Sequence, residues 1–168
     1  MPRPSAVVAV DTNVLIDRAL EDEVILDCLD TIRKRLGGAT FVLLPTVIQE
    51  LAFLAEEGRT QRERDVAALA LRSVSRWKFV PLNFIPAGHG VVEQIAARMR
   101  SKGLLPEEEI NDSIIIAEAA LAGVTLLVSS DAHIRDIDYT ALKIELDACD
   151  VSTPLIAAPQ KIVKSFFN

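Results

Sequence analysis

The feature that most constrains the fold is an alternation of short, β-branched apolar segments with longer segments of helical pattern. The clearest strand segments are Ala6–Val10, Thr40–Leu44 and Val124–Ser129, which are typical of buried parallel strands. Helices are predicted from near residue 13 or 21 to 36, and over 45–58, 60–76, 91–100 and 112–122, with a short strand over 77–82 and a possible C-terminal helix ending at Phe166 and Phe167. Strands joined by helices predict an α/β fold with a parallel sheet covered on both faces.

Composition places this pattern in one globular domain spanning residues 1–168. Half of the 168 residues are hydrophobic and a quarter are charged, which argues against disorder. Cys28 and Cys149 are the two cysteines, too few for a disulfide scaffold and typical of a reducing cytoplasm. No apolar run reaches the roughly 20 residues of a membrane span. The apolar run before Asp11 has no small-residue cleavage pattern, so we interpret it as a first strand and expect a cytoplasmic protein without a membrane anchor.

Charge is distributed unevenly along the chain. The net charge is −6, but residues 59–103 carry nine basic and three acidic side chains, whereas residues 104–150 carry two and eleven. One interpretation is a set of solvated helix faces. The other is a basic flank that holds a polyanion beside metal-binding carboxylates. The candidates for that flank are Arg59, Arg62, Arg64, Arg72, Arg76 and Lys78.

Four carboxylates carry the strongest chemical signal. Asp11 directly follows the first strand segment, and Asp131 follows the third by two residues. Glu50 and Asp112 lie among apolar residues of predicted helices. Each aspartate alone could be a helix N-cap, and Glu50 alone could be an ordinary helix position. Ligands of parallel sheets bind beyond the carboxyl ends of strands, so one cleft could hold all four acids.

Carboxylates that converge in a cleft repel one another unless a cation is present. Hard oxygen ligands favour Mg²⁺ or Mn²⁺, which polarise phosphoryl oxygens and generate hydroxide. A zinc enzyme is disfavoured because His89 and His133 are the two histidines and no Cys/His cluster has zinc spacing. Phosphate-binding glycine loops and the Gly-x-Ser-x-Gly nucleophile motif are also missing from the sequence.

Three segments together resemble the PIN-domain family of metal-dependent nucleases. They are VVAVDTNVLID, PTVIQEL and NDSIIIAEAALAGVTLLVSSD, and the resemblance extends from about Ala6 to Asp138. It implies a three-layer α/β/α sandwich with a central, mostly parallel sheet. It also implies that Asp11, Glu50, Asp112 and Asp131 are the catalytic, metal-binding acids, and that Asn13 and Ser129 orient carboxylates or water.

One position departs from the family pattern. Many members carry a second aspartate two residues after the fourth acid, and here His133 stands at that position. Asp136 and Asp138 are at a different offset, so the occupancy of a second metal position is left open. The implied reaction is hydrolysis of a phosphodiester by a metal-activated water, with single-stranded RNA as the substrate expected by analogy.

Alternative functions remain at this stage. A haloacid-dehalogenase-like phosphohydrolase also places an aspartate after its first strand, but it normally has an aspartate where this chain has Asn13. A catalytically silent binding module is the other alternative. Within the family, both a toxin paired with an antitoxin protein and an RNA-processing enzyme fit the sequence. A homodimer is a further hypothesis, based on the family and on the apolar residues Ile162, Val163, Phe166 and Phe167.

Overall fold

A single parallel sheet organises the fold. The structure is a computed structural model that describes residues 5–167, with side chains described up to residue 165. Within this range the strands β1 (Val7–Val10), β2 (Thr40–Leu43), β3 (Phe79–Pro81), β4 (Leu126–Val128) and β5 (Leu155–Ala157) form one sheet in the order β3-β2-β1-β4-β5. All pairs of neighbouring strands are parallel. The predicted α/β class with a parallel sheet is confirmed.

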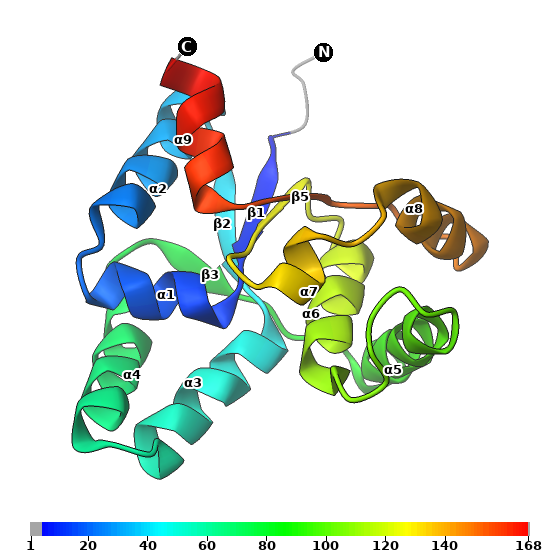
Figure 1. Ribbon diagram of the computed structural model, residues 1–168, viewed down its shortest axis with the longest axis horizontal. Coiled ribbons are helices and arrows are strands. Elements are labelled where there is room, and N and C mark those ends of the chain that lie inside the picture. Colours follow the sequence, from blue (N-terminus) through cyan, green and yellow to red (C-terminus); the bar gives the residue numbers. More distant parts are fainter. Residues whose placement is uncertain (1–4, 168) are drawn as a thin grey trace.

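Helices cover both faces of this sheet (Figure 1). In the view of Figure 1, α1, α2, α4 and α9 lie to the left of the strands, and α5, α6 and α8 lie to the right. The described helices are α1 (Thr12–Ala19), α2 (Glu23–Arg35), α3 (Pro45–Glu57), α4 (Gln61–Ser73), α5 (Pro86–Ser101), α6 (Ile110–Leu121), α7 (Ala132–Arg135), α8 (Tyr139–Ala148) and α9 (Pro159–Phe167). The layers are those of the expected α/β/α sandwich.

The segment after β1 forms two helices, α1 and α2. The sequence had predicted a helix here that begins near residue 13 or near residue 21. Asp22 is the N-cap of α2, and its carboxylate accepts a hydrogen bond of 3.1 Å from the backbone N–H of Ile25. Glu21 just before it adopts a positive φ of 58°, a conformation that no helix interior contains. The cap and the turn together divide α1 from α2.

Two helices begin earlier than predicted. Gly88 and Gly90 were expected to precede a helix that starts at Val91, but α5 begins at Pro86 and contains both glycines. Pro86 at the first helical position has a backbone conformation that already suits a helix. This offsets the entropic cost of the two glycines in the first turns of α5. The helix α6 begins at Ile110 with Glu109 as its N-cap, so Asp112 lies inside the first turn and does not begin the helix.

Three elements after Asp131 were not predicted. They are the short helix α7, the helix α8 and the three-residue strand β5. The helix α7 is one turn long and β5 is shorter than a typical strand, so neither shows a hydrophobic period. Asp138 begins α8, because its carboxylate accepts a hydrogen bond of 2.9 Å from the backbone N–H of Ala141.

The C-terminal helix packs on its own chain. Ile162 is 5% exposed and belongs to the main hydrophobic core, and Val163 packs against that core. The helix α9 contacts α2. These two residues therefore serve intramolecular packing rather than the homodimer surface for which they were considered, and the side chains of Phe166 and Phe167 lie outside the described residues.

Candidate metal centre

Asp11 is anchored at the carboxyl end of the central strand. Its backbone N–H continues the β1–β4 pairing with a hydrogen bond of 2.9 Å to the carbonyl of Val128. Its side chain then begins α1, with Oδ1 accepting a hydrogen bond of 2.7 Å from the N–H of Thr12. Asp11 is 4% exposed. Burial raises the pKa of this carboxyl, the hydrogen bonds from Ser129 and Thr12 oppose the rise, and the nearby charge of Asp131 adds to it.

Ser129 joins the first and fourth acids of the predicted set. Its hydroxyl donates a hydrogen bond of 2.8 Å to Asp11 Oδ2 and accepts one of 3.1 Å from the backbone N–H of Asp131. Asp131 is the N-cap of α7, where Oδ1 accepts a hydrogen bond of 2.8 Å from the N–H of His133. One buried hydroxyl thus sets the relative position of two carboxylates on neighbouring parts of the sheet edge.

Glu50 enters the same cluster from α3. Its Oε1 atom is buried and has no hydrogen-bond partner among the described residues, and the same is true of Thr12 Oγ1. The pKa of Glu50 is raised to about 7, mainly by burial and further by the charges of Asp11 and Asp131. A buried carboxylate oxygen without a donor is expensive for the protein unless a cation compensates it.

Asp112, in the first turn of α6, also has a buried carboxylate oxygen without a partner among the described residues. Its Oδ2 atom is buried with no hydrogen-bond partner in the described part of the chain. Burial raises the pKa of Asp112 to about 7, and the charges of Asp131, Asp11 and Glu109 add to the effect. The charges of Asp11 and Asp131 act on both Glu50 and Asp112, and the elements that carry these acids meet at the carboxyl ends of the strands.

A histidine and a further glutamate border this cluster. His133 Nδ1 lies 3.1 Å from Glu109 Oε1, 3.8 Å from Asp131 Oδ1 and 4.0 Å from Asp112 Oδ2. One ligand atom each from Glu109, Asp112 and His133 lies within 4.8 Å of the other two. Sequence reasoning noted His133 as a departure but missed Glu109, although the run Glu107–Glu109 directly before an apolar helix was a visible signal.

The two acids that could have replaced the missing aspartate lie in other interactions. Asp136 forms an exposed ion pair with Arg135, with Oδ1 3.0 Å from Nε, and Asp138 caps α8. Asn13 is exposed on α1 and lines a cavity of about 310 Å³ between α1 and α4, together with Ile16 and Leu54. No hydrogen bond within the described residues joins Asn13 to the acids.

The residues of the predicted basic flank lie along and around α4 and directly before β3. Arg64 holds the turn before α4, with hydrogen bonds to the carbonyl of Gly58 and to Gln61 Oε1. Lys78 precedes β3 and lines a cavity with Gly38, Ala39 and Thr40 at the amino ends of the strands, opposite the acids. Arg59, Arg62, Arg72 and Arg76 are exposed along and around α4, with Arg76 3.3 Å from Ser73 Oγ.

Glu118 is a buried acid that sequence reasoning missed. It is 2% exposed in α6, and its two oxygens accept hydrogen bonds of 3.1 Å from the backbone N–H and the hydroxyl of Thr46. Burial raises its pKa to about 7; the Thr46 bonds oppose the rise and the charge of Glu50 adds to it. The available signal was a single acid within the apolar run Ile114–Ala122.

Comparison with known proteins places this arrangement in a family. The chain belongs to the PIN domain family, whose sequence model matches residues 8–139. PIN domains are generally nucleases and typically use divalent metal ions, so the family supports a hydrolase here. The group formed by Glu109, Asp112 and His133 is a candidate metal site. The predicted resemblance is confirmed, and the same match argues against the haloacid-dehalogenase-like alternative.

Solved structures share the fold. VapBC2 from Rickettsia felis, bound to a DNA fragment from its promoter, is 13% identical, with a TM-score of 0.60 over 90% of this chain and 98% of that chain. FitAcB from Neisseria gonorrhoeae is 17% identical, with a TM-score of 0.54 over 90% of this chain and 97% of that chain. No curated protein sequence matches the chain. Among the described residues, no helix is both long and apolar enough to cross a membrane.

Proposed function

We propose that the protein is a divalent-metal-dependent endoribonuclease that hydrolyses phosphodiester bonds of single-stranded RNA. Asp11, Glu50, Asp112 and Asp131 would hold Mg²⁺ or Mn²⁺. The observation that carries the proposal is the pair of buried, unpartnered carboxylate oxygens on Glu50 and Asp112 beside two further acids. Oxygen atoms of this kind are ligands that hard divalent cations prefer.

The bound cation would supply Lewis-acid stabilisation of the phosphate and lower the pKa of a water molecule. The chain's own residues have separate tasks. Ser129 and the N–H of Thr12 hold the carboxylate of Asp11 in one orientation, which is a positioning role. One carboxylate oxygen each of Glu50 and Asp112 is buried, which strengthens the interaction of that oxygen with any positive charge that enters the site.

The biological setting is also part of the proposal. The likeness to VapBC2 and FitAcB favours a toxin controlled by an antitoxin protein, with an RNA-processing enzyme as the other role within the same chemistry. A cytoplasmic location is part of the proposal, and the two free thiols Cys28 and Cys149 are consistent with it. A homodimer is proposed from the family alone.

The test is cleavage of labelled single-stranded RNA and DNA with Mg²⁺, with Mn²⁺ and with EDTA. Asp112→Asn should abolish metal-dependent cleavage, and Asp147→Asn, an equal change at an exposed position of α8, should leave it unchanged. Isothermal titration with each cation gives a second readout. Binding of a cation to the wild-type chain without cleavage of any RNA would refute the nuclease and favour the silent binding module.

A further inference from the structure

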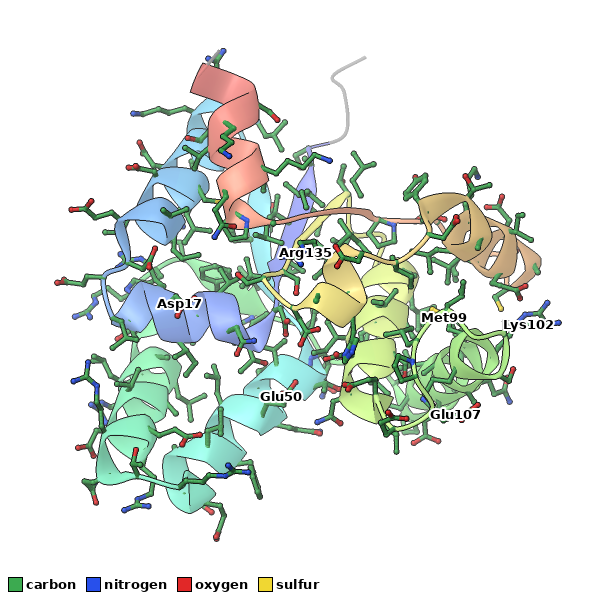
Figure 2. The ribbon with its side chains drawn as sticks, viewed as in Figure 1. Asp17, Glu50, Met99, Lys102, Glu107 and Arg135 are labelled. Atoms are coloured by element: carbon green, nitrogen blue, oxygen red, sulfur yellow. The ribbon has the colours of Figure 1, made fainter. Side chains whose placement is uncertain are left out.

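Two cavities lie at the same edge of the sheet as the acid cluster, beyond the carboxyl ends of β2 and β5. The first, of about 550 Å³, is lined by Thr46, Gln49, Glu50, Phe53, Leu54 and Asn111. The second, of about 650 Å³, is bordered by the three cationic side chains Arg135, Lys161 and Lys164. Figure 2 places Arg135 and Glu50 above and below the start of α1 in the view, where Asp11 is located.

The first cavity combines an exposed aromatic ring with amide groups. Phe53 is 63% exposed, and it is the one exposed phenylalanine among those whose side chains the structure describes. It lies three residues after Glu50 on α3, so both residues lie on one side of the helix. Gln49 and Asn111 are exposed beside it, and their amides can donate to and accept from the edge of a base. An unpaired base requires such a ring for stacking and such groups for hydrogen bonding.

The second cavity is joined to the acids through β5. The backbone N–H of Ser129 donates a hydrogen bond of 3.1 Å to the carbonyl of Ala157, a residue of this cavity, and the Ser129 side chain binds Asp11. Arg135 closes the short helix that Asp131 begins. Lys161 and Lys164 are three residues apart on α9 and therefore project from one face of it. Residues 151–168 contain these two lysines and no acid.

We propose that a single RNA strand crosses the acid cluster between these cavities. One base stacks on Phe53 with its edge toward Gln49 and Asn111, and phosphates on the other side of the cleaved bond pair with Arg135, Lys161 and Lys164. The inference rests on the proposed function and gives it a substrate path. This path differs from the basic flank predicted at residues 59–78, and the lysines of α9 lie outside the matched family segment.

The phosphate part of the path is tested by charge reversal. In an Asp112→Asn background with Mg²⁺, the double variant Lys161→Glu/Lys164→Glu is compared with Lys102→Glu/Lys143→Glu, which changes the net charge equally at the C-cap of α5 and on α8. Lys102 lies far from Arg135 in Figure 2. The affinity for a labelled single-stranded RNA is measured by fluorescence anisotropy at several salt concentrations. The slope of log affinity against log salt concentration should be smaller in magnitude by about 1.4 for the first double variant than for the second, the value for two lost phosphate contacts. Equal behaviour of the two double variants would overturn this part.

The base part is tested by removing the ring. Phe53→Ala should weaken RNA binding about tenfold, within the range for one stacked base. Phe53→Trp should restore it, while Tyr139→Ala, at an exposed aromatic position of α8, should have no effect. An RNA carrying 2-aminopurine next to the cleavage site should lose its stacking-dependent quenching in Phe53→Ala only. Unchanged affinity and quenching would overturn the stacking role and leave Phe53 as a contact for a protein partner.

The binding assays also separate the two proposals. Wild-type cleavage of RNA combined with unaltered binding by the Lys161/Lys164 and Phe53 variants would refute the path and keep the nuclease. Binding that depends on these residues in a wild-type chain that cleaves no RNA would refute the nuclease and keep the path. Thermal unfolding of each variant establishes that a loss of affinity reflects a missing contact in a folded chain.

Discussion

Glu118 should make the stability of the protein depend on pH. Its pKa moves from an ordinary value of 4.5 to about 7 in the folded chain. Below pH 4.5 Glu118 is protonated in both states and does not affect the free energy of unfolding. As the pH rises from 4.5 to about 7, the unfolded chain loses this proton first, so the free energy of unfolding falls. Each pH unit between the two values corresponds to about 1.4 kcal/mol, so the full cost is about 3 kcal/mol.

The variant Glu118→Gln isolates this effect, because glutamine keeps the shape of the protonated side chain and its carbonyl can still accept from the N–H of Thr46. Urea unfolding in EDTA between pH 4.5 and pH 8 should give similar free energies for both chains at the acidic end. At pH 8 the variant should be more stable by up to about 3 kcal/mol. Glu57→Gln, at an exposed position of α3, is the matched control. A difference between wild type and Glu118→Gln that stays constant over this pH range would refute the reasoning.

Three further predictions concern the acid cluster. Asp112→Asn should raise the melting temperature of the metal-free protein at pH 8, because Asp112, with its pKa of about 7, is charged there. The same variant should lose the increase in melting temperature that Mg²⁺ or Mn²⁺ causes in the wild type. An increase that survives in the variant would contradict this. Ser129→Ala should cost about 1–2 kcal/mol in urea unfolding, because buried Asp11 loses a donor, and an unchanged midpoint would disprove that cost. His133→Asp should lower affinity for Mn²⁺ relative to Mg²⁺ in titration calorimetry, because an imidazole is a poor ligand for Mg²⁺; an unchanged ratio would remove His133 from the metal site.

The order of the central elements could be predicted from sequence because their signals are local. The runs that became β1, β2 and β4 are β-branched and buried, and Pro45 and Gly58 bound α3. The elements that were missed are stabilised by tertiary contacts. The strand β5 has three residues and pairs with β4 through the register Leu127–Ile156, so its extended conformation depends on a partner distant in sequence.

The convergence of Asp11 and Asp131 could be predicted because the carboxyl ends of parallel strands meet at one edge of a sheet, whereas Glu50 and Asp112 were selected through the resemblance to the PIN-domain family. The burial and hydrogen-bond partners of the individual acids could not be predicted. That Asp112 Oδ2 is buried without a donor depends on how α6 packs against its neighbours, and the pairing of Glu118 with Thr46 joins residues 72 positions apart. The role of the predicted basic flank also stays a prediction, since charge along the sequence does not state which edge of the sheet a side chain reaches. Lys78 lines a cavity at the amino ends of the strands, whereas Lys161 lines one that includes Ala157 at the carboxyl end of β5.

The capping role of Asp11 and its proposed metal-binding role are compatible. Each carboxylate oxygen has two lone pairs, and the described contacts of Asp11 are one hydrogen bond to each oxygen. The cap therefore fixes the side chain and still leaves acceptor capacity toward Glu50 and Asp112, whose buried oxygens lack donors. The two carboxylate oxygens of Asp11 therefore serve both the N-cap of α1 and the proposed metal site. Without a cation, the cluster holds like charges at a cost in stability, and that cost is the free energy a divalent ion would relieve on binding.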